Sequence, residues 1–316
     1  MRALRTLAAV TVAFAYALVA LSPIVRITES GMGCGDDWPL CNGRLIPPLD
    51  NPEVMIEWGH RLAAAGVSVL VLALLAAAWL QRQVPGVAGR GGILGPVLLA
   101  TGLLVAQILL GAVTVWLELP AGVVVVHLAN AMALLAVLCV TLLRAQGAIS
   151  GSPTPATSTA WRGAVAAAAL GAVALLLGGL TANLHAGPAC QGFPLCNDRL
   201  WPAGSSSTLV HVHWMHRVVA YLLLFHLVGL AVGAARRREP RRVTVPAFTT
   251  LGLMGLHVAA AALMIFRFLP LELRATHAAL GTLLWATLVW LAWAAAPRRA
   301  TAPTRATAPP RATAAT

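Results

Sequence analysis

Eight apolar runs without a charged residue constrain this chain more than any other feature. They cover Leu7–Val25, Leu62–Gln81, Ile93–Val115, Ala121–Leu143, Gly163–Thr181, Val218–Ala235, Val243–Phe266 and Ala275–Ala296. A helix needs about 20 apolar residues to cross a bilayer, and each run approaches or exceeds that length. Only 10% of the residues are charged, against roughly a quarter in a soluble domain. The sequence therefore predicts an all-α polytopic membrane protein with eight transmembrane helices.

The first run follows Arg2 and Arg5, so a cleaved secretory signal is an alternative for it. Its length, the lack of a clear small-residue cleavage site and the even number of spans favour a retained helix.

The arginines predict the orientation in the membrane. The chain contains 22 arginines and no lysine. With the N-terminus in the cytoplasm, the cytoplasmic segments hold 15 arginines and one acid, a net charge of +14, and the outer segments hold 7 arginines and 9 acids, a net charge of −2. This asymmetry is the one expected of a cell-membrane protein with both termini in the cytoplasm. Because no basic segment is interleaved with aromatic readers, the net charge of +12 does not indicate a nucleic-acid partner.

The chain reads as a tandem repeat. WPLCN at 38–42 matches FPLCN at 193–197, EWGHR at 57–61 matches HWMHR at 213–217, and HLA at 127–129 matches HAA at 277–279. Because each half contains four spans, we expect two pseudo-symmetric four-helix bundles side by side. The expected divisions are a first bundle at 1–144, a cytoplasmic linker at 145–160, a second bundle at 161–297 and a disordered cytoplasmic tail at 298–316.

Four histidines occupy equivalent positions in the two halves: His60, His127, His216 and His277. Each lies near the start of an inward-running span, so all four are expected at one depth near the outer face. Ionisable groups inside membranes are costly and usually functional. Two facing imidazoles among small residues suit a heme with two axial ligands, whereas zinc or di-iron sites need additional ligands. The alternative is an interfacial histidine that binds backbone or water.

Residues beside the histidines are further candidates. Glu57 precedes His60 by three positions on the same helical face, where a carboxylate could accept a proton or stabilise positive charge. It could equally be an acid favoured by the helix dipole. His213 takes this position in the second half. Arg61 and Arg217 could pair with heme propionates or extend to the interface.

The outer loops each carry two cysteines, Cys34 and Cys41 in the first and Cys190 and Cys196 in the second. Disulfides persist on the outer side of a membrane, and these spacings differ from the C-x-x-C of exchange enzymes. We expect two structural disulfides, with a redox role as the alternative. Cys139, inside the fourth span, is expected only to pack.

Several of these motifs resemble those of the bacterial heme A synthases, in order, over about residues 26–290. They are the segment TESGMGCGDDWPLCNG at 28–43, Glu57-x-x-His60-Arg61, Gln107-x-x-Leu110-Gly111-Ala112-x-Thr114-Val115, His127-Leu128, His216-Arg217 and Thr276-His277-Ala278. One departure is His257, which stands where a second copy of the Gln107 motif would begin.

The resemblance implies an eight-span oxidoreductase that converts the C8 methyl of heme O to the formyl group of heme A, for cytochrome oxidase. By this resemblance His216 and His277 ligate a resident heme b, and His60 and His127 border the heme O site. Glu57 would be the catalytic carboxylate, and Cys34 and Cys41 the first-loop pair. Heme O is the implied substrate, with heme O synthase and an electron donor as partners.

Two other classes of membrane protein are alternatives to this function. A di-heme b-type electron-transfer subunit of a quinone oxidoreductase would use the same histidines without chemistry on heme. A duplicated transporter would bind its substrate near the midplane on broken helices, which fits these polar positions poorly.

Overall fold

Eight long helices form nearly all of the regular structure in the computed structural model, which describes residues 1–147, 156–202, 204 and 207–297. They are α1 (Arg2–Ile27), α2 (Pro52–Leu80), α3 (Leu94–Trp116), α4 (Ala121–Ala145), α5 (Ser158–Asn183), α6 (Thr208–Arg236), α7 (Arg241–Phe266) and α8 (Leu271–Ala295), with short 3-10 helices η1 (Ser30–Met32) and η2 (Gly187–Ala189). All eight are long and apolar enough to cross a membrane. The predicted all-α, eight-span fold is confirmed.

Backbone hydrogen bonding explains why these segments are helical, because a lipid-facing peptide group must find its partner within its own helix. The helices extend beyond the apolar runs at the loop end. Helix α2 begins at Pro52, ten residues before the predicted start, where the Asn51 side chain accepts a hydrogen bond from the amide of Glu53. The turns of α2 and α6 nearest the long loops therefore carry charged residues that an apolar-run criterion excludes.

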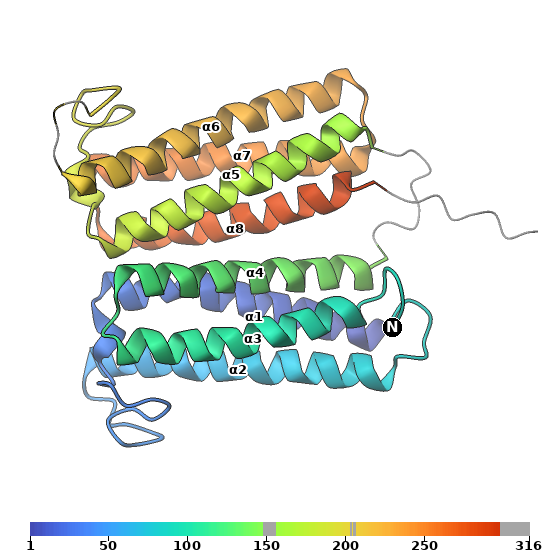
Figure 1. Cartoon of the computed structure of the whole chain (residues 1–316), viewed down its shortest axis with the longest axis horizontal. Helices are drawn as coiled ribbons and strands as arrows, with labels where there is room; N and C mark the ends of the chain where they lie inside the picture. Colours follow the sequence, from blue (N-terminus) through green and yellow to red (C-terminus); the bar gives the residue numbers. More distant parts are fainter. Residues whose placement is uncertain (148–155, 203, 205–206, 298–316) are drawn as a thin grey trace, which may run out of the picture.

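The helices are arranged as two bundles of four (Figure 1). In the first bundle, each helix packs against the next one in the sequence, from α1 to α4, and α4 also packs against α1. Helices α5 to α8 of the second bundle are arranged in the same way. Helix α8 contacts α1 and α4 across the interface between the bundles, and α4 also contacts α5. Hydrogen bonds that connect the two bundles include Trp285 Nε1 to the Met132 carbonyl at 2.9 Å, the Tyr16 hydroxyl to the Ala279 carbonyl at 3.4 Å and the Arg26 guanidinium to the Ala182 carbonyl at 2.8 Å.

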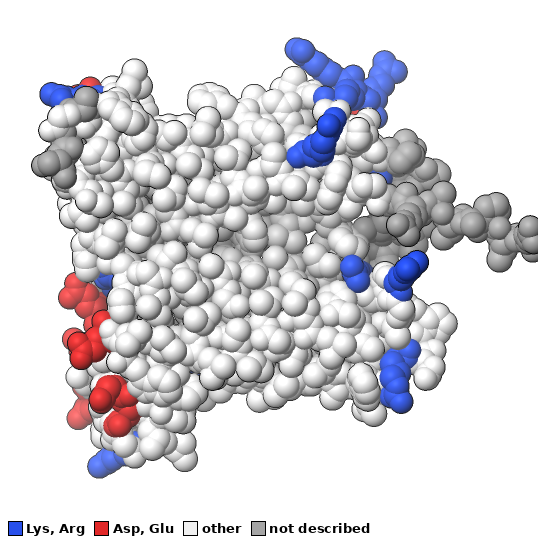
Figure 2. Space-filling view, viewed as in Figure 1, with Lys and Arg blue, Asp and Glu red and all other residues white. Residues whose placement is uncertain are grey.

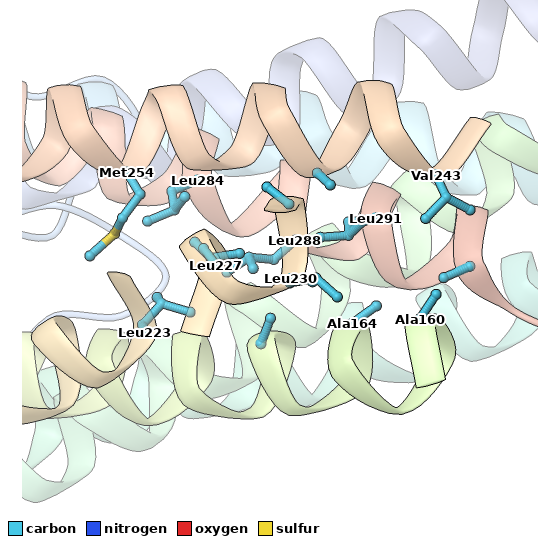
Figure 3. Close-up of a cluster of buried hydrophobic side chains, with 14 residues drawn as sticks. Ala160, Ala164, Leu223, Leu227, Leu230, Val243, Met254, Leu284, Leu288 and Leu291 are labelled. Carbon is cyan, nitrogen blue, oxygen red and sulfur yellow. The ribbon is translucent and has the colours of Figure 1, made fainter. Parts of the chain in front are cut away.

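The second bundle contains a continuous apolar core in which side chains of α5, α6, α7 and α8 meet (Figure 3). Small residues of α5 allow close packing against leucines of α6 and α8. A Cβ at Gly171 of α5 would lie 2.4 Å from Leu288 Cδ1, so any larger residue there would require the Leu288 side chain to move. The labelled members of this core are Ala160, Ala164, Leu223, Leu227, Leu230, Val243, Met254, Leu284, Leu288 and Leu291.

The two ends of the bundles differ in charge and in loop length. Both long loops, after α1 and after α5, lie at the same end (Figure 1), and acidic side chains gather there while arginines gather at the opposite end (Figure 2). At that opposite end α5 begins at Ser158, inside the predicted linker, because Thr157 caps it by accepting a hydrogen bond from the Ala160 amide. Residues 148–155 of the predicted linker and the predicted tail at 298–316 lie outside the described residues.

Candidate functional site

The four repeated histidines lie at the loop end of the bundles, at matching positions in their helices. His60 and His216 are the ninth residues of α2 and α6, and His127 and His277 are the seventh residues of α4 and α8. At 1.5 Å per residue this is roughly 9–12 Å inside the helix start. His60 and His127 lie on α2 and α4 of the first bundle, and His216 and His277 lie on α6 and α8 of the second. Each bundle therefore contains one pair.

A serine of α1 orients the first histidine. The Ser22 hydroxyl donates its single proton to the Leu18 carbonyl at 2.6 Å and lies 3.4 Å from His60 Nδ1. The hydroxyl can therefore only accept from the imidazole, which places the proton on Nδ1. That leaves Nε2 of His60 as the nitrogen available to a ligand or metal.

His127 has a different set of neighbours. Its Nε2 lies 2.9 Å from Nε2 of Gln107 on α3. Asn130, one turn after His127, donates to the side-chain oxygen of Gln107 at 2.7 Å and to the Leu103 carbonyl at 2.9 Å. His127 Nδ1 is buried and makes no hydrogen bond to the described residues.

The second pair is arranged without these side chains. His216 Nδ1 donates directly to the Ala174 carbonyl at 3.0 Å. Position 178, which corresponds to Ser22, is glycine, and a Cβ there would lie 3.0 Å from His216 Cε1. Position 257, which corresponds to Gln107, is a histidine whose ring stacks on His277 with 4.0 Å between the ring centroids.

Glu57 and Arg61 connect the first histidine helix to its disulfide loop. Glu57 is buried; its Oε2 accepts from the Cys34 amide at 2.8 Å and its Oε1 pairs with Arg61 at 2.5 Å. The Arg61 guanidinium also donates to the carbonyls of Asp37 at 2.7 Å and Leu40 at 2.5 Å. Glu57 was predicted as the catalytic carboxylate and Arg61 as a partner of heme propionates, and in the structure both side chains bind the disulfide loop.

In the second half, an arginine and a histidine of α6 bind the second disulfide loop in the same way, without a carboxylate. Arg217 donates to the carbonyls of Cys190 at 2.5 Å, Gly192 at 2.8 Å and Leu195 at 2.6 Å. His213, in the place of Glu57, receives a hydrogen bond from Arg217 at 3.3 Å and donates from Nδ1 to the Ala186 carbonyl at 3.0 Å. In both halves the arginine beside the histidine holds the loop through backbone carbonyls.

The two predicted disulfides are present. Cys34 and Cys41 are joined with an S–S distance of 1.97 Å, and Cys190 and Cys196 with 2.01 Å. All four cysteines are buried, each pair beneath a tryptophan of the following helix, Trp58 or Trp214. Cys139 is buried with a free thiol.

Comparison with known proteins identifies the family. A family model described as cytochrome oxidase assembly protein matches residues 5–289. The heme A synthase of Shouchella clausii is 30% identical over 85% of this chain and 89% of its own. The heme A synthase of Symbiobacterium thermophilum is 29% identical over 94% and 97%, and that of Geobacillus kaustophilus 30% over 90% and 88%. The chain belongs to the heme A synthase family.

Membership of the heme A synthase family implies a heme substrate, and the histidine surroundings fit a heme. Within the described residues no three His, Cys, Asp or Glu side chains come together as a metal-ion site. The Nδ1 atoms of His60 and His216 are hydrogen-bonded, which leaves Nε2 as the nitrogen that can bind a metal; this is the usual support of an iron ligand. Glycines leave room beside the rings: a Cβ at Gly111 would lie 3.3 Å from His127 Cε1.

Sequence reasoning assigned no role to the residues that contact the four histidines. Ser22, Asn130 and Gly178 were not singled out, and Gln107 and His257 were noted only as motif positions. Their signal is the difference between the halves at the repeat offsets: Ser22 against Gly178, Gln107 against His257, and Asn130 against Leu280.

Proposed function

We propose that this chain is a heme A synthase of the cell membrane, which oxidises the C8 methyl of heme O to the formyl group of heme A. The observation that carries the proposal is the coincidence of family membership over most of the chain with two equivalent histidine pairs, one in each bundle. The di-heme electron-transfer alternative accounts for the histidines but not for the family.

The reaction proceeds by two hydroxylations. Each consumes one dioxygen molecule together with two electrons and two protons, inserts one oxygen atom into a C–H bond of the methyl carbon and releases the other as water, which gives first an alcohol and then a geminal diol. The diol loses water to leave the formyl group. The whole conversion is thus a four-electron oxidation of one carbon, and an external electron donor and heme O synthase are the proposed partners.

The first bundle is the proposed substrate side. His60 and His127 border heme O, with His60 oriented through Ser22. Glu57, three residues from His60, is the proposed catalytic carboxylate, which holds a proton or stabilises positive charge near the reacting methyl. Because both carboxylate oxygens already bind Cys34 and Arg61, Glu57 would act while it is bound to the disulfide loop.

The second bundle is the proposed cofactor side, where His216 and His277 hold a heme b that supplies one-electron transfer when bound. The fixed contact of His216 to a backbone carbonyl suits a permanent ligand. Arg61 and Arg217 are proposed as cofactor-binding residues: of the five N–H groups of a guanidinium, Arg61 uses three on Asp37, Leu40 and Glu57 and Arg217 uses four on His213 and the loop, and the remaining ones are proposed to bind heme propionates.

The proposed orientation places both termini in the cytoplasm and the histidines near the outer face. The arginine asymmetry of the sequence supports it. The two bundles proposed from the repeat, at residues 1–144 and 161–297, would each hold one heme.

The test is to produce the chain in a host that makes heme O but no heme A, and to identify the extracted hemes by chromatography and mass. Heme A should appear with the native chain. His60→Ala and His277→Ala should abolish it, whereas His211→Ala, at a partly exposed position in the first turn of α6, should not. Heme O alone from the native chain, with its b-type spectrum intact, would favour the electron-transfer alternative.

A further inference from the structure

The hydrogen bonds around Gln107 fix which way its amide points. The Leu103 carbonyl can only accept, so the Asn130 side-chain nitrogen faces it and is the NH2 group. That same NH2 group donates to the side-chain oxygen of Gln107. The other end of the Gln107 amide is therefore its NH2, which faces His127 Nε2 at 2.9 Å.

This orientation determines what His127 offers. Since Gln107 donates, Nε2 of His127 must accept with its lone pair, and the ring proton lies on Nδ1. The Nε2 lone pair is also the one that an iron would bind when the ring proton lies on Nδ1. The Gln107 amide and an iron therefore compete for one pair of electrons on His127.

The second half lacks this competitor. His257 replaces Gln107 and Leu280 replaces Asn130. His257 lies face to face with His277, with an interplanar angle of 16°, and a Cβ at Gly281 would lie 3.3 Å from its Cε1, so the glycine makes room for it. The stacked ring lies over the face of the His277 imidazole, and the buried Nδ1 of His277 has no hydrogen-bond partner among the described residues.

We propose that Gln107, held in place by Asn130, is a latch that takes His127 off the heme iron in the first bundle. This inference rests on the proposed function, in which the first bundle holds the substrate. With His127 latched, one axial position of the substrate iron is open to an external ligand, and the substrate is held by fewer bonds and can be exchanged for product. His277 has no such competitor and stays bound. Gln107 and Asn130 are positioning residues, since they act through His127.

The experiment loads the purified chain with hemin, reduces it with dithionite and measures carbon monoxide binding. In the native protein, the heme of the first bundle should bind carbon monoxide, and the resident heme should not. Gln107→Leu and, separately, Asn130→Leu should reduce the rate of carbon monoxide binding about fivefold or more, the factor expected for one buried hydrogen bond. The first-bundle heme should at the same time become more low-spin in its absorption and electron paramagnetic resonance spectra.

The reciprocal variant needs no added heme. His257→Gln combined with Leu280→Asn places the latch beside His277, and the resident heme as purified should gain carbon monoxide binding. His257→Leu with Leu280 unchanged is the matched control, which removes the stacked ring without adding a donor and should not gain it. An unchanged absorption spectrum of the resident heme in the Gln107 and Asn130 variants would show that these variants have folded.

Two results would overturn the latch: no carbon monoxide binding beyond that of the resident heme in the hemin-loaded native protein, or equal rates and spin states in native protein and latch variants. Neither depends on heme A formation. Absence of heme A with the latch results intact would count against the proposed function instead.

Discussion

Glu57 and Arg61 form an ion pair of 2.5 Å across one turn of α2, and both also bind the disulfide loop. His213 and Arg217 make the corresponding connection in α6 without a carboxylate. The loop can therefore be held by an imidazole as well as by an acid. The carboxylate of Glu57, which His213 replaces in the second half, therefore distinguishes the proposed substrate side from the proposed cofactor side.

Glu57→His tests this difference directly, because it copies the second-half residue into the first half. We expect the disulfide loop to remain closed, since an imidazole serves this position in α6, but heme A to be lost and heme O or the hydroxylated intermediate to accumulate. Heme extraction measures the products, and proteolysis of residues 28–51 reports the loop. Native heme A yield in this variant would show that Glu57 serves only the loop.

Arg61→Lys should open the same loop while leaving its disulfide intact. A lysine cannot reproduce the forked contacts to the Asp37 and Leu40 carbonyls and to Glu57. Each buried group left without its partner costs about 1–3 kcal/mol, so the melting temperature should fall and proteolysis of 28–51 should speed up. Arg44→Lys, at an exposed position of the same loop, is the control and should change neither quantity.

The sequence predicted the spans, the repeat, the histidine pairs and the disulfides because each depends on a strong local pattern: apolar length, repeated text or paired cysteines. It did not predict that Arg61 and Arg217 bind loop carbonyls, since a carbonyl acceptor carries no side-chain signature. Helix starts were misplaced by about ten residues at α2 because capping by Asn51, not apolarity, determines where the helix begins. The roles of Ser22 and Asn130 depend on contacts between helices, which motif spacing along one helix does not describe.

Gly178→Ala should lower the content of resident heme. The added Cβ would lie 3.0 Å from Cε1 and 3.3 Å from Nδ1 of His216, so the ring must move away from the Ala174 carbonyl. Alanine is the better helix former by about 1 kcal/mol, so a loss of heme cannot be attributed to a weaker helix. Gly255→Ala on α7, where a Cβ meets nothing within 4 Å, is the control. The pyridine hemochrome assay gives heme per protein, and equal heme in both variants would contradict the assignment of His216 as a ligand.

Ser22→Ala should weaken heme binding in the first bundle and leave the second unchanged. Without the hydroxyl, His60 Nδ1 loses its acceptor, and the Leu18 carbonyl is already bound within the helix, so the ring can turn away from its ligating orientation. Loss of a hydrogen bond behind a metal-binding histidine typically reduces metal affinity about tenfold or more. A titration of the purified protein with hemin should therefore show about tenfold weaker loading of the added site at constant resident-heme absorbance. Ser22→Thr, which retains the hydroxyl, should restore most of the affinity. If Ser22→Ala and the native chain load hemin equally, His60 does not depend on Ser22 for its orientation.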